Sequence, residues 1–241
     1  MKKIKFNKVF IIAEIGVNHN GNLSNAKKLI YKSKLAGADA VKFQTFDIDS
    51  NYSKKNSSKN KRQWASDLFF TKNQFKILKK YSDSLNLEFI STPFDLKSVQ
   101  ILKELKLNYI KIASSSTFEE DLVKKISKLN KHIIVSSGMQ KISQIEKTLK
   151  IFKNNKIALL YCVSLYPSPY ESVNLNMIEK FSKRFNVTIG FSDHSKGIEL
   201  PIAAVAKGAK IIEKHIMLSK KIKCPDFKVS LTPIDFKNMV K

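Results

Sequence analysis

The segments Val187-Thr-Ile-Gly-Phe-Ser-Asp-His194 and Lys210-Ile-Ile-Glu-Lys-His215 are short apolar runs that end in polar side chains. Residues 198–207 lie between them, are mostly apolar and small, and end at Gly208. An apolar run of this length is typical of a strand buried in a parallel sheet, and the intervening stretch is long enough for a helix. The sequence therefore predicts a strand, helix, strand unit here.

The same unit recurs along the whole chain. Eight apolar runs alternate with Lys-rich stretches that have apolar residues at helical spacing, such as 23–35, 75–85 and 142–152. The apolar runs are residues 9–14, 40–44, 87–92, 109–114, 132–137, 157–162, 187–194 and 210–215. Eight such units predict an α/β fold, a (β/α)8 TIM barrel, with residues 1–241 as one catalytic domain. In that fold the C-terminal strand ends meet at one mouth where active sites are built, and the polar residues lie there.

The chain is strongly basic, with a formal net charge of +24 over 241 residues. Clustered lysines could indicate nucleic acid or an anionic surface as a partner. Here the lysines are spread over nearly every predicted helix, without a basic tail or stripe. The pattern favours a solvated outer ring of helices, so we expect no nucleic-acid partner.

Cysteine content and the N-terminus narrow the class of protein. Cys162 and Cys224 are the only cysteines, which excludes a disulfide framework, and Cys162 ends an apolar run as a small core residue would. The basic residues 1–8 precede an apolar stretch that Glu14 and Asn18 interrupt, so neither a signal peptide nor a membrane span is predicted. We expect a cytoplasmic enzyme.

Two segments outside the repeating units are notable. Residues 46–72 are rich in Ser, Asn and Lys without clear periodicity, and they predict a structureless lid or oligomer contact over the mouth, with Trp64 as an anchor. Thr232 and Pro233 provide an N-cap and a first-turn proline for a last helix.

Residues two apart in a strand share a face, which groups several polar side chains at the strand ends. Lys42 with Gln44, Ser192 with His194, and Glu213 with His215 are such pairs. His194 and His215 could bind one divalent cation, with Glu213, Asp193 or Asp226 as oxygen ligands or as partners of the rings. Alternatively they are two unrelated polar histidines. His132 begins its strand, so we expect it at the opposite end of the barrel.

Lys42 and Lys111 lie inside apolar segments, where an ammonium must find an anion or stay hydrated. Both at one mouth, with Ser114, Ser136 and Ser192 as donors, would form a receptor for a small phosphorylated carboxylate. The alternative is that one or both lysines extend outward to solvent. Glu14 ends the first run, and its carboxylate either has a raised pKa suited to proton transfer or holds one of these lysines.

Several motifs together resemble the N-acetylneuraminate (sialic acid) synthase family, which includes legionaminate and pseudaminate synthases. The match runs in order from Phe10 to about Val240. Its motifs are Phe10-Ile-Ile-Ala-Glu-Ile-Gly-Val-Asn-His-Asn-Gly21, Ala38-Asp-Ala-Val-Lys-Phe-Gln-Thr45, Ser91-Thr-Pro-Phe94, Ile110-Lys-Ile-Ala-Ser114, Ser137-Gly-Met139, Tyr166-Pro-Ser-Pro169, Ser192-Asp-His194 and Glu213-Lys-His215.

The resemblance implies a transferase that condenses phosphoenolpyruvate with an open-chain N-acetylated hexose. The products would be a nine-carbon α-keto acid and phosphate, with C–O cleavage of phosphoenolpyruvate and Mn²⁺ or Mg²⁺ polarising the aldehyde. It implies that His194 and His215 bind the metal and that Glu14 handles protons. The phosphoenolpyruvate residues would be Lys42, Thr92, Lys111, Ser114, Ser136 and Ser192, and the sugar residues Gln44, Tyr166 and Asp226. A homodimer is also possible.

Three departures from the family pattern qualify this expectation. Ser116 stands where relatives carry an acidic residue, so a second acid–base group is either missing or supplied by Glu119 or Glu120. Cys224 and Phe227 replace a frequent glycine and histidine, which allows a different sugar pocket. Relatives continue into an antifreeze-like (SAF) domain that donates an arginine to the partner's sugar site, and we expect it to be absent here.

Two other functions remain open from the sequence. One is a phosphoenolpyruvate–aldose condensing enzyme that takes a shorter sugar. The other is a non-catalytic barrel that binds a sugar or nucleic acid through its basic exterior. A binder of the second kind would keep its ligand when His194 or Lys42 is substituted, and would lose it at high salt.

Overall fold

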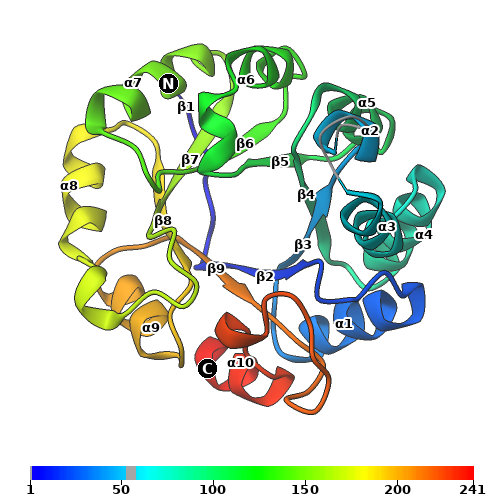
Figure 1. Ribbon diagram of the computed structural model, residues 1–241. Helices are drawn as coiled ribbons and strands as arrows, with labels where there is room; N and C mark the ends of the chain where they lie inside the picture. Colours follow the sequence, from blue (N-terminus) through cyan, green and yellow to red (C-terminus); the bar gives the residue numbers. More distant parts are fainter. Residues whose placement is uncertain (1, 53–57) are drawn as a thin grey trace.

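A closed barrel of parallel strands forms the centre of the molecule (Figure 1). The computed structural model describes residues 2–52 and 58–241, and within them each barrel strand pairs with the next and the last pairs with the first. The barrel strands are β2 (Phe10–Gly16), β3 (Ala40–Thr45), β4 (Glu88–Pro93), β5 (Tyr109–Ile112), β6 (His132–Ser136), β7 (Lys156–Cys162), β8 (Thr188–Asp193) and β9 (Ile211–His215). All eight predicted strands are confirmed, and the fold is the predicted TIM barrel.

A ring of helices surrounds the barrel, and each follows one strand (Figure 1). The outer helices are α1 (Leu23–Leu35), α4 (Lys72–Ser84), α5 (Leu96–Glu104), α6 (Glu120–Ser127), α7 (Ile142–Ile151), α8 (Asn176–Arg184), α9 (Glu199–Ala206) and α10 (Pro233–Val240). Short 3-10 turns lie at η1 (Ser115–Phe118), η2 (Tyr170–Ser172) and η3 (Phe227–Val229). Helix α10 begins as predicted, because the Thr232 hydroxyl accepts from the Asp235 amide at 3.3 Å. None of the helices within the described ranges is long and apolar enough to cross a membrane.

The strands are apolar on both faces because each face packs into a different hydrophobic layer. One layer lies between the barrel and the helices. The other fills the barrel interior with small and branched side chains, Ile4, Ile12, Ala40, Ile90, Ile134, Ala158, Leu160 and Ile211. Because side chains alternate along a strand, the residues two positions after the last interior residue of a strand face into the barrel mouth.

The N-terminal residues close the lower end of the barrel. Strand β1 (Lys2–Lys3) pairs with the start of β7, and Ile4 joins the interior cluster. The Phe6 ring stacks on Phe10, with centroids 4.6 Å apart. His132 lies at this end beside Tyr109, as expected for a residue that begins its strand. The predicted site residues line the opposite, upper mouth.

The segment between β3 and α4 is more ordered than the sequence predicts. It forms α2 (Ile48–Asn51) and α3 (Lys59–Leu68), so a structureless connection is wrong for its described part; residues 53–57 lie outside the described residues. Asp47 and Ser58 cap the two helices. Trp64 is half exposed and packs its edge on Phe69. A role as lid or oligomer contact stays a prediction.

Candidate active site

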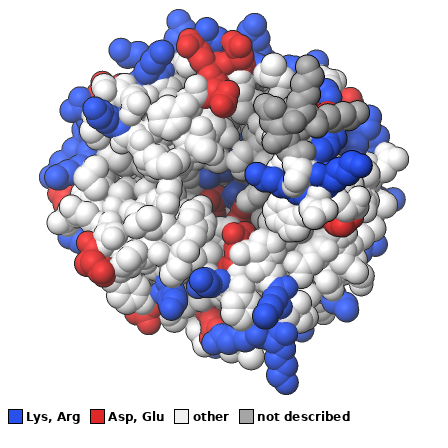
Figure 2. Space-filling view, viewed as in Figure 1, with Lys and Arg blue, Asp and Glu red and all other residues white. Residues whose placement is uncertain are grey.

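A cavity of about 500 Å³ opens at the upper mouth of the barrel, and every strand contributes to it. Figure 2 shows charged atoms of both signs inside this hollow, while lysines are spread around the periphery. Every residue that the sequence predicted for the site lines the cavity, namely Glu14, Lys42, Gln44, Thr92, Lys111, Ser114, Ser136, Tyr166, Ser192, His194, His215 and Asp226. The three same-face pairs point inward, as predicted.

Two lysines project into the cavity rather than outward to solvent. Lys42 and Lys111 are 4% and 3% exposed. The Lys111 ammonium donates to the Ser136 hydroxyl at 2.6 Å, and Lys42 Nζ lies 3.4 Å from Thr92 Oγ1. Burial lowers the pKa of Lys111. For Lys42 burial acts in the same direction, but the carboxylates of two glutamates overcome it and raise the pKa. Both ammoniums are thus held ready for an anion.

Two glutamates neutralise these lysines in different ways. Glu14 Oε2 lies 2.9 Å from Lys42 Nζ, and Glu213 lies 3.7 Å from Lys42 and 3.4 Å from Lys111. Ser192 donates to Glu213 Oε1 at 2.8 Å. Burial raises the pKa of Glu14 to about 7, because Lys42 only partly offsets it. Burial acts in the same direction on Glu213, but Lys111 and Lys42 outweigh it and lower the pKa to about 2. Glu14 therefore has a raised pKa and also contacts Lys42, whereas Glu213 stays ionised. A role of Glu14 in proton transfer stays a prediction.

The two predicted imidazoles lie together. The rings of His194 and His215 have centroids 5.6 Å apart. Burial lowers the pKa of His194 to about 4 and that of His215 to about 3, so both rings are neutral at pH 7. His194 Nδ1 lies 2.9 Å from the Val163 carbonyl oxygen, and His215 Nδ1 is 3.4 Å from an Asp226 oxygen. Neutral imidazole is the form that binds metals.

Some acidic residues considered from the sequence lie elsewhere. Asp193 points away from the cavity and bonds to Lys214, because alternation along β8 places it on the outer face. It cannot be an oxygen ligand in the cavity. Glu119 and Glu120 do not line the cavity either, and Glu120 pairs with Lys124 at the surface of α6. Neither glutamate supplies the second acid–base group.

The side of the cavity near the loop after β9 holds an amide, a phenol and a carboxylate. The Tyr166 ring lies over His194, with centroids 4.0 Å apart. A Cβ at Gly16 would lie 3.2 Å from Glu14 Oε1 and 3.3 Å from Asp226 Oδ2. Gly16 also has a φ of +53°, which an L side chain rarely adopts. Glycine at this position keeps room beside both carboxylates.

Several lining residues were not predicted. Phe94, Ser164 and Met139 line the cavity from loops, where no strand period indicates direction. Cys162, expected in the core, is buried but borders the cavity, with its sulfur 3.7 Å from His194 Nδ1. A Cβ at Gly138 would lie 2.3 Å from the Ser164 hydroxyl, so the glycine after β6 is the one sequence feature that hints at this close packing.

Comparison with known protein families identifies the family of this chain. The NeuB family model matches residues 29–241. The chain belongs to the NeuB family. It is therefore a transferase, a phosphoenolpyruvate-dependent nonulosonic acid synthase.

Individual relatives span most of the chain. It is 42% identical to an uncharacterized protein of Methanocaldococcus jannaschii, over 96% of this chain and 68% of that protein. It is 41% identical to N,N'-diacetyllegionaminic acid synthase of Campylobacter jejuni, over 95% of this chain and 74% of that enzyme. The crystal structure of the N-acetylneuraminic acid synthetase of Leptospira borgpetersenii, in complex with citrate, has a TM-score of 0.93 and 34% identity, covering 99% of this chain and 86% of that one.

Proposed function

We propose that this NeuB-family chain condenses phosphoenolpyruvate with an open-chain N-acetylated hexose. C3 of phosphoenolpyruvate bonds to the aldehyde carbon, water adds to C2, and phosphate leaves with its bridging oxygen as the C–O bond breaks. The products are a nine-carbon α-keto acid and phosphate. The observation that carries the proposal is one cavity that joins two buried ammoniums, two neutral imidazoles and a carboxyl whose pKa is about 7.

The lysine side of the cavity is suited to phosphoenolpyruvate. Lys42 and Lys111 supply fixed positive charge, and Thr92, Ser114, Ser136 and Ser192 supply hydroxyl donors. Without substrate the two ammoniums share Glu14 and Glu213. The phosphate and carboxylate of an entering substrate can replace the glutamates as partners of the ammoniums. Glu14 is the glutamate that is more easily protonated, because its pKa is about 7 and that of Glu213 is about 2.

The imidazole side fits a divalent metal, which NeuB-family enzymes use. Metal–nitrogen bonds are about 2 Å long, so rings with centroids 5.6 Å apart are close enough to share an ion. His215 Nδ1 is also buried without a hydrogen-bond partner among the described residues. No group of three or more His, Cys, Asp or Glu side chains in residues 2–52 and 58–241 is arranged to hold an ion, so the proposed protein ligands are the two imidazoles alone. His194 and His215 would hold the divalent cation, Mn²⁺ or Mg²⁺, which would supply a Lewis acid for the aldehyde oxygen.

Glu14 is placed to handle protons between the two sides. Its carboxyl touches Lys42, and Gly16 leaves it open toward Asp226. With a pKa of about 7 it can give a proton and take one back at neutral pH. Gln44, Tyr166 and Asp226 are the polar groups on the open side, and we assign them to the sugar. The relatives are named for legionaminic, pseudaminic and sialic acid products, so we limit the proposed sugars to the precursors of these three acids.

A phosphate-release assay tests the proposal. The protein is incubated with phosphoenolpyruvate, Mn²⁺ and a panel of N-acetylated hexoses, with shorter aldoses as the comparison. We expect phosphate release only with an N-acetylated hexose, and a mass for the product equal to the condensed acid. Release with a four- or five-carbon aldose alone would favour the shorter-sugar enzyme, and no release with any sugar would contradict the proposal.

His215→Ala is the matched variant for the metal side. It removes one imidazole without touching Lys42 or Lys111, so we expect turnover to fall by at least ~100-fold while phosphoenolpyruvate still binds. The thermal unfolding curve checks that the variant is folded. Unchanged turnover with added Mn²⁺ would contradict the metal assignment. The homodimer stays a prediction, which sedimentation velocity can test.

A further inference from the structure

A buried ion pair lies directly behind the two imidazoles. Asp193 precedes His194 in the chain, and Lys214 precedes His215. Because side chains alternate along a strand, both project to the outer face of the barrel while the imidazoles face the cavity. Lys214 is 0% exposed, Asp193 is 1% exposed, and the two form an ion pair across β8 and β9. Neither residue lines the cavity.

The ammonium of Lys214 contacts the residues on both sides of His194. It donates to the Asp193 carboxylate and to the backbone carbonyl of Ser195. The carboxylate in turn accepts from the Ser195 amide and from the Ser195 hydroxyl, each at 3.0 Å. One side chain adjacent to His215 is therefore tied to both residues that flank His194.

This contact begins where the sheet stops. The ladder between β8 and β9 runs through Phe191, Ser192 and Asp193, and its last pair is Asp193 with Lys214. His194 lies one residue beyond this last pair, whereas His215 is still part of β9. The His194 carbonyl accepts from the Ser168 amide at 2.9 Å, in the loop after β7.

A buried ion pair is a costly way to gain stability, because two charges lose their hydration and apolar side chains of similar volume often serve as well. What it adds is a fixed contact, because a buried ammonium cannot exchange its partners for water and so keeps the Asp193 carboxylate and the Ser195 carbonyl together. We propose that Lys214 and Asp193 are positioning residues that set the spacing of His194 and His215 for the metal. The inference rests on the proposed function, because it assigns the metal to these two rings.

The test is Mn²⁺ affinity without substrates. The double variant Asp193→Asn/Lys214→Met removes both charges, keeps similar shapes and leaves no uncompensated ion. The matched control is Thr45→Val/Ser91→Ala, which removes a buried hydroxyl pair, 2.7 Å apart, that links β3 and β4. Titration followed by electron paramagnetic resonance gives the Kd for Mn²⁺. We expect the Kd to rise about 10- to 100-fold in the double variant and not in the control.

A second measurement separates positioning from general destabilisation. Phosphoenolpyruvate affinity in the absence of metal depends on Lys42 and Lys111, so it should be the same in both double variants and the parent. Asp193→Asn and Lys214→Met singly should each weaken Mn²⁺ binding, and their effects should not add, because they break the same contact.

The outcomes distinguish the two ideas. If the folded double variant binds Mn²⁺ as tightly as the parent, the positioning role is overturned while the metal site stands. If the parent binds no Mn²⁺, or binds it equally after His215→Ala, the metal site of the proposed function fails and this inference fails with it. Equal weakening in the Thr45/Ser91 control would also overturn it, since the effect would then follow from loss of stability.

Discussion

At the scale of single residues, the site holds two buried glutamates that ionise at very different pH values. Glu213 sits between two ammoniums and receives a hydroxyl donor, so it remains ionised. Glu14 is equally buried but depends mainly on Lys42, which it shares with Glu213. Glu213 has Lys111 as a second cationic neighbour, so it stays ionised, whereas Glu14 titrates near neutral pH.

The raised pKa of Glu14 predicts a pH dependence of stability. The folded protein holds this proton between pH 4.5, where the unfolded carboxyl releases it, and about 7. Stability from Glu14 is therefore fully present below pH 4.5 and is lost as the pH rises through 7. At ~1.4 kcal/mol per pKa unit, the free energy of unfolding of the parent should fall by ~3 kcal/mol between pH 5 and 8 through Glu14. The Glu14→Gln variant has no such carboxyl, so it should not show this fall. Urea unfolding at several pH values measures this, and parallel curves would contradict it.

Lys111 is the second residue whose role can be measured directly. Its ammonium bonds to Ser136 and pairs with Glu213 at the centre of the site. Because hydrogen bonds to charged groups contribute ~1.5–3 kcal/mol, Lys111→Met should raise the KM for phosphoenolpyruvate about 10- to 100-fold. Lys147→Met, on the exposed face of α7, is the control. An unaltered KM in the Lys111 variant would refute the assignment.

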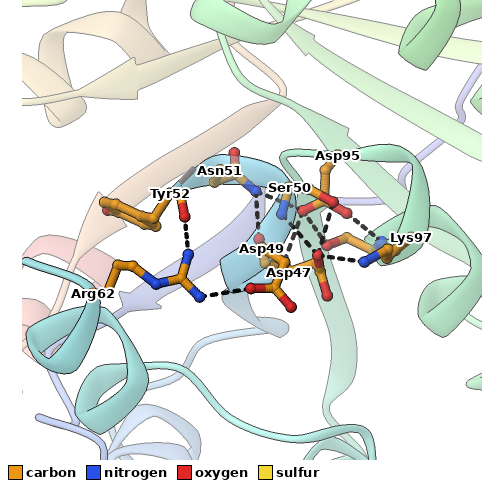
Figure 3. A network of polar contacts seen from close by, with 9 residues as sticks. Asp47, Asp49, Ser50, Asn51, Tyr52, Arg62, Asp95 and Lys97 are labelled. Carbon is orange, nitrogen blue, oxygen red and sulfur yellow. Dashed lines mark hydrogen bonds and ion pairs between the residues drawn. The ribbon is translucent and has the colours of Figure 1, made fainter. Parts of the chain in front are cut away.

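At the scale of elements, polar contacts fasten the segment between β3 and α4 beside the mouth (Figure 3). Asp95 accepts from the Asp47 amide at 2.7 Å, from Asn51 at 2.8 Å and from the Ser98 amide at 2.7 Å. It therefore caps α5 and holds α2 at once. In the same segment the Phe46 ring stacks on the rings of Phe69 and Phe94, in each case with centroids 4.2 Å apart.

This network predicts unequal effects of two neighbouring substitutions. Asp95→Ala leaves an N-cap and two further donors unpaired, so we expect a loss of ~1–3 kcal/mol in the free energy of unfolding. Lys97→Ala removes an exposed ion pair with Asp47, 2.9 Å long, and should cause no measurable change. Denaturant unfolding of both variants checks the contrast. Equal effects would show that Asp95 does not act as the common acceptor.

At the scale of the whole molecule, the barrel is open at one end and closed at the other. The mouth collects side chains from every strand, whereas Ile4 and Phe6 close the base. The Thr188 hydroxyl donates to the Ile4 carbonyl, which ties the N-terminal residues to β8. Stability and chemistry are thus placed at opposite ends, as is typical of this fold.

The closed base predicts a variant that separates stability from activity. Ile4→Ala leaves a hole in the interior cluster and should lower the free energy of unfolding by about 2–5 kcal/mol. Because Ile4 lies at the far end of the barrel from His194 and Lys42, kcat at a temperature where the variant is folded should match that of the parent. Thermal unfolding and phosphate release measure the two effects. A large fall in kcat would show that the base and the mouth are coupled.

The sequence by itself determined the strands, their order along the chain and which polar side chains share a face. Period-two alternation decides which residues share a face, so Lys42 with Gln44 and Glu213 with His215 were predictable as pairs. Caps such as Thr232 were predictable because their chemistry is local. The family motifs added which residues belong to one site.

Only the tertiary structure decided the charge states and the supporting contacts. The pKa of Glu14 depends on Lys42, Glu213 and complete burial, which come from separate strands. The sequence offers Asp193 as a candidate ligand, but in the closed sheet Asp193 lies on the outer face and pairs with Lys214. The short helix α2 is likewise held by Asp95, far along the chain. Alternation and capping act within a few residues, whereas desolvation and ion pairing depend on neighbours that only the folded barrel brings together.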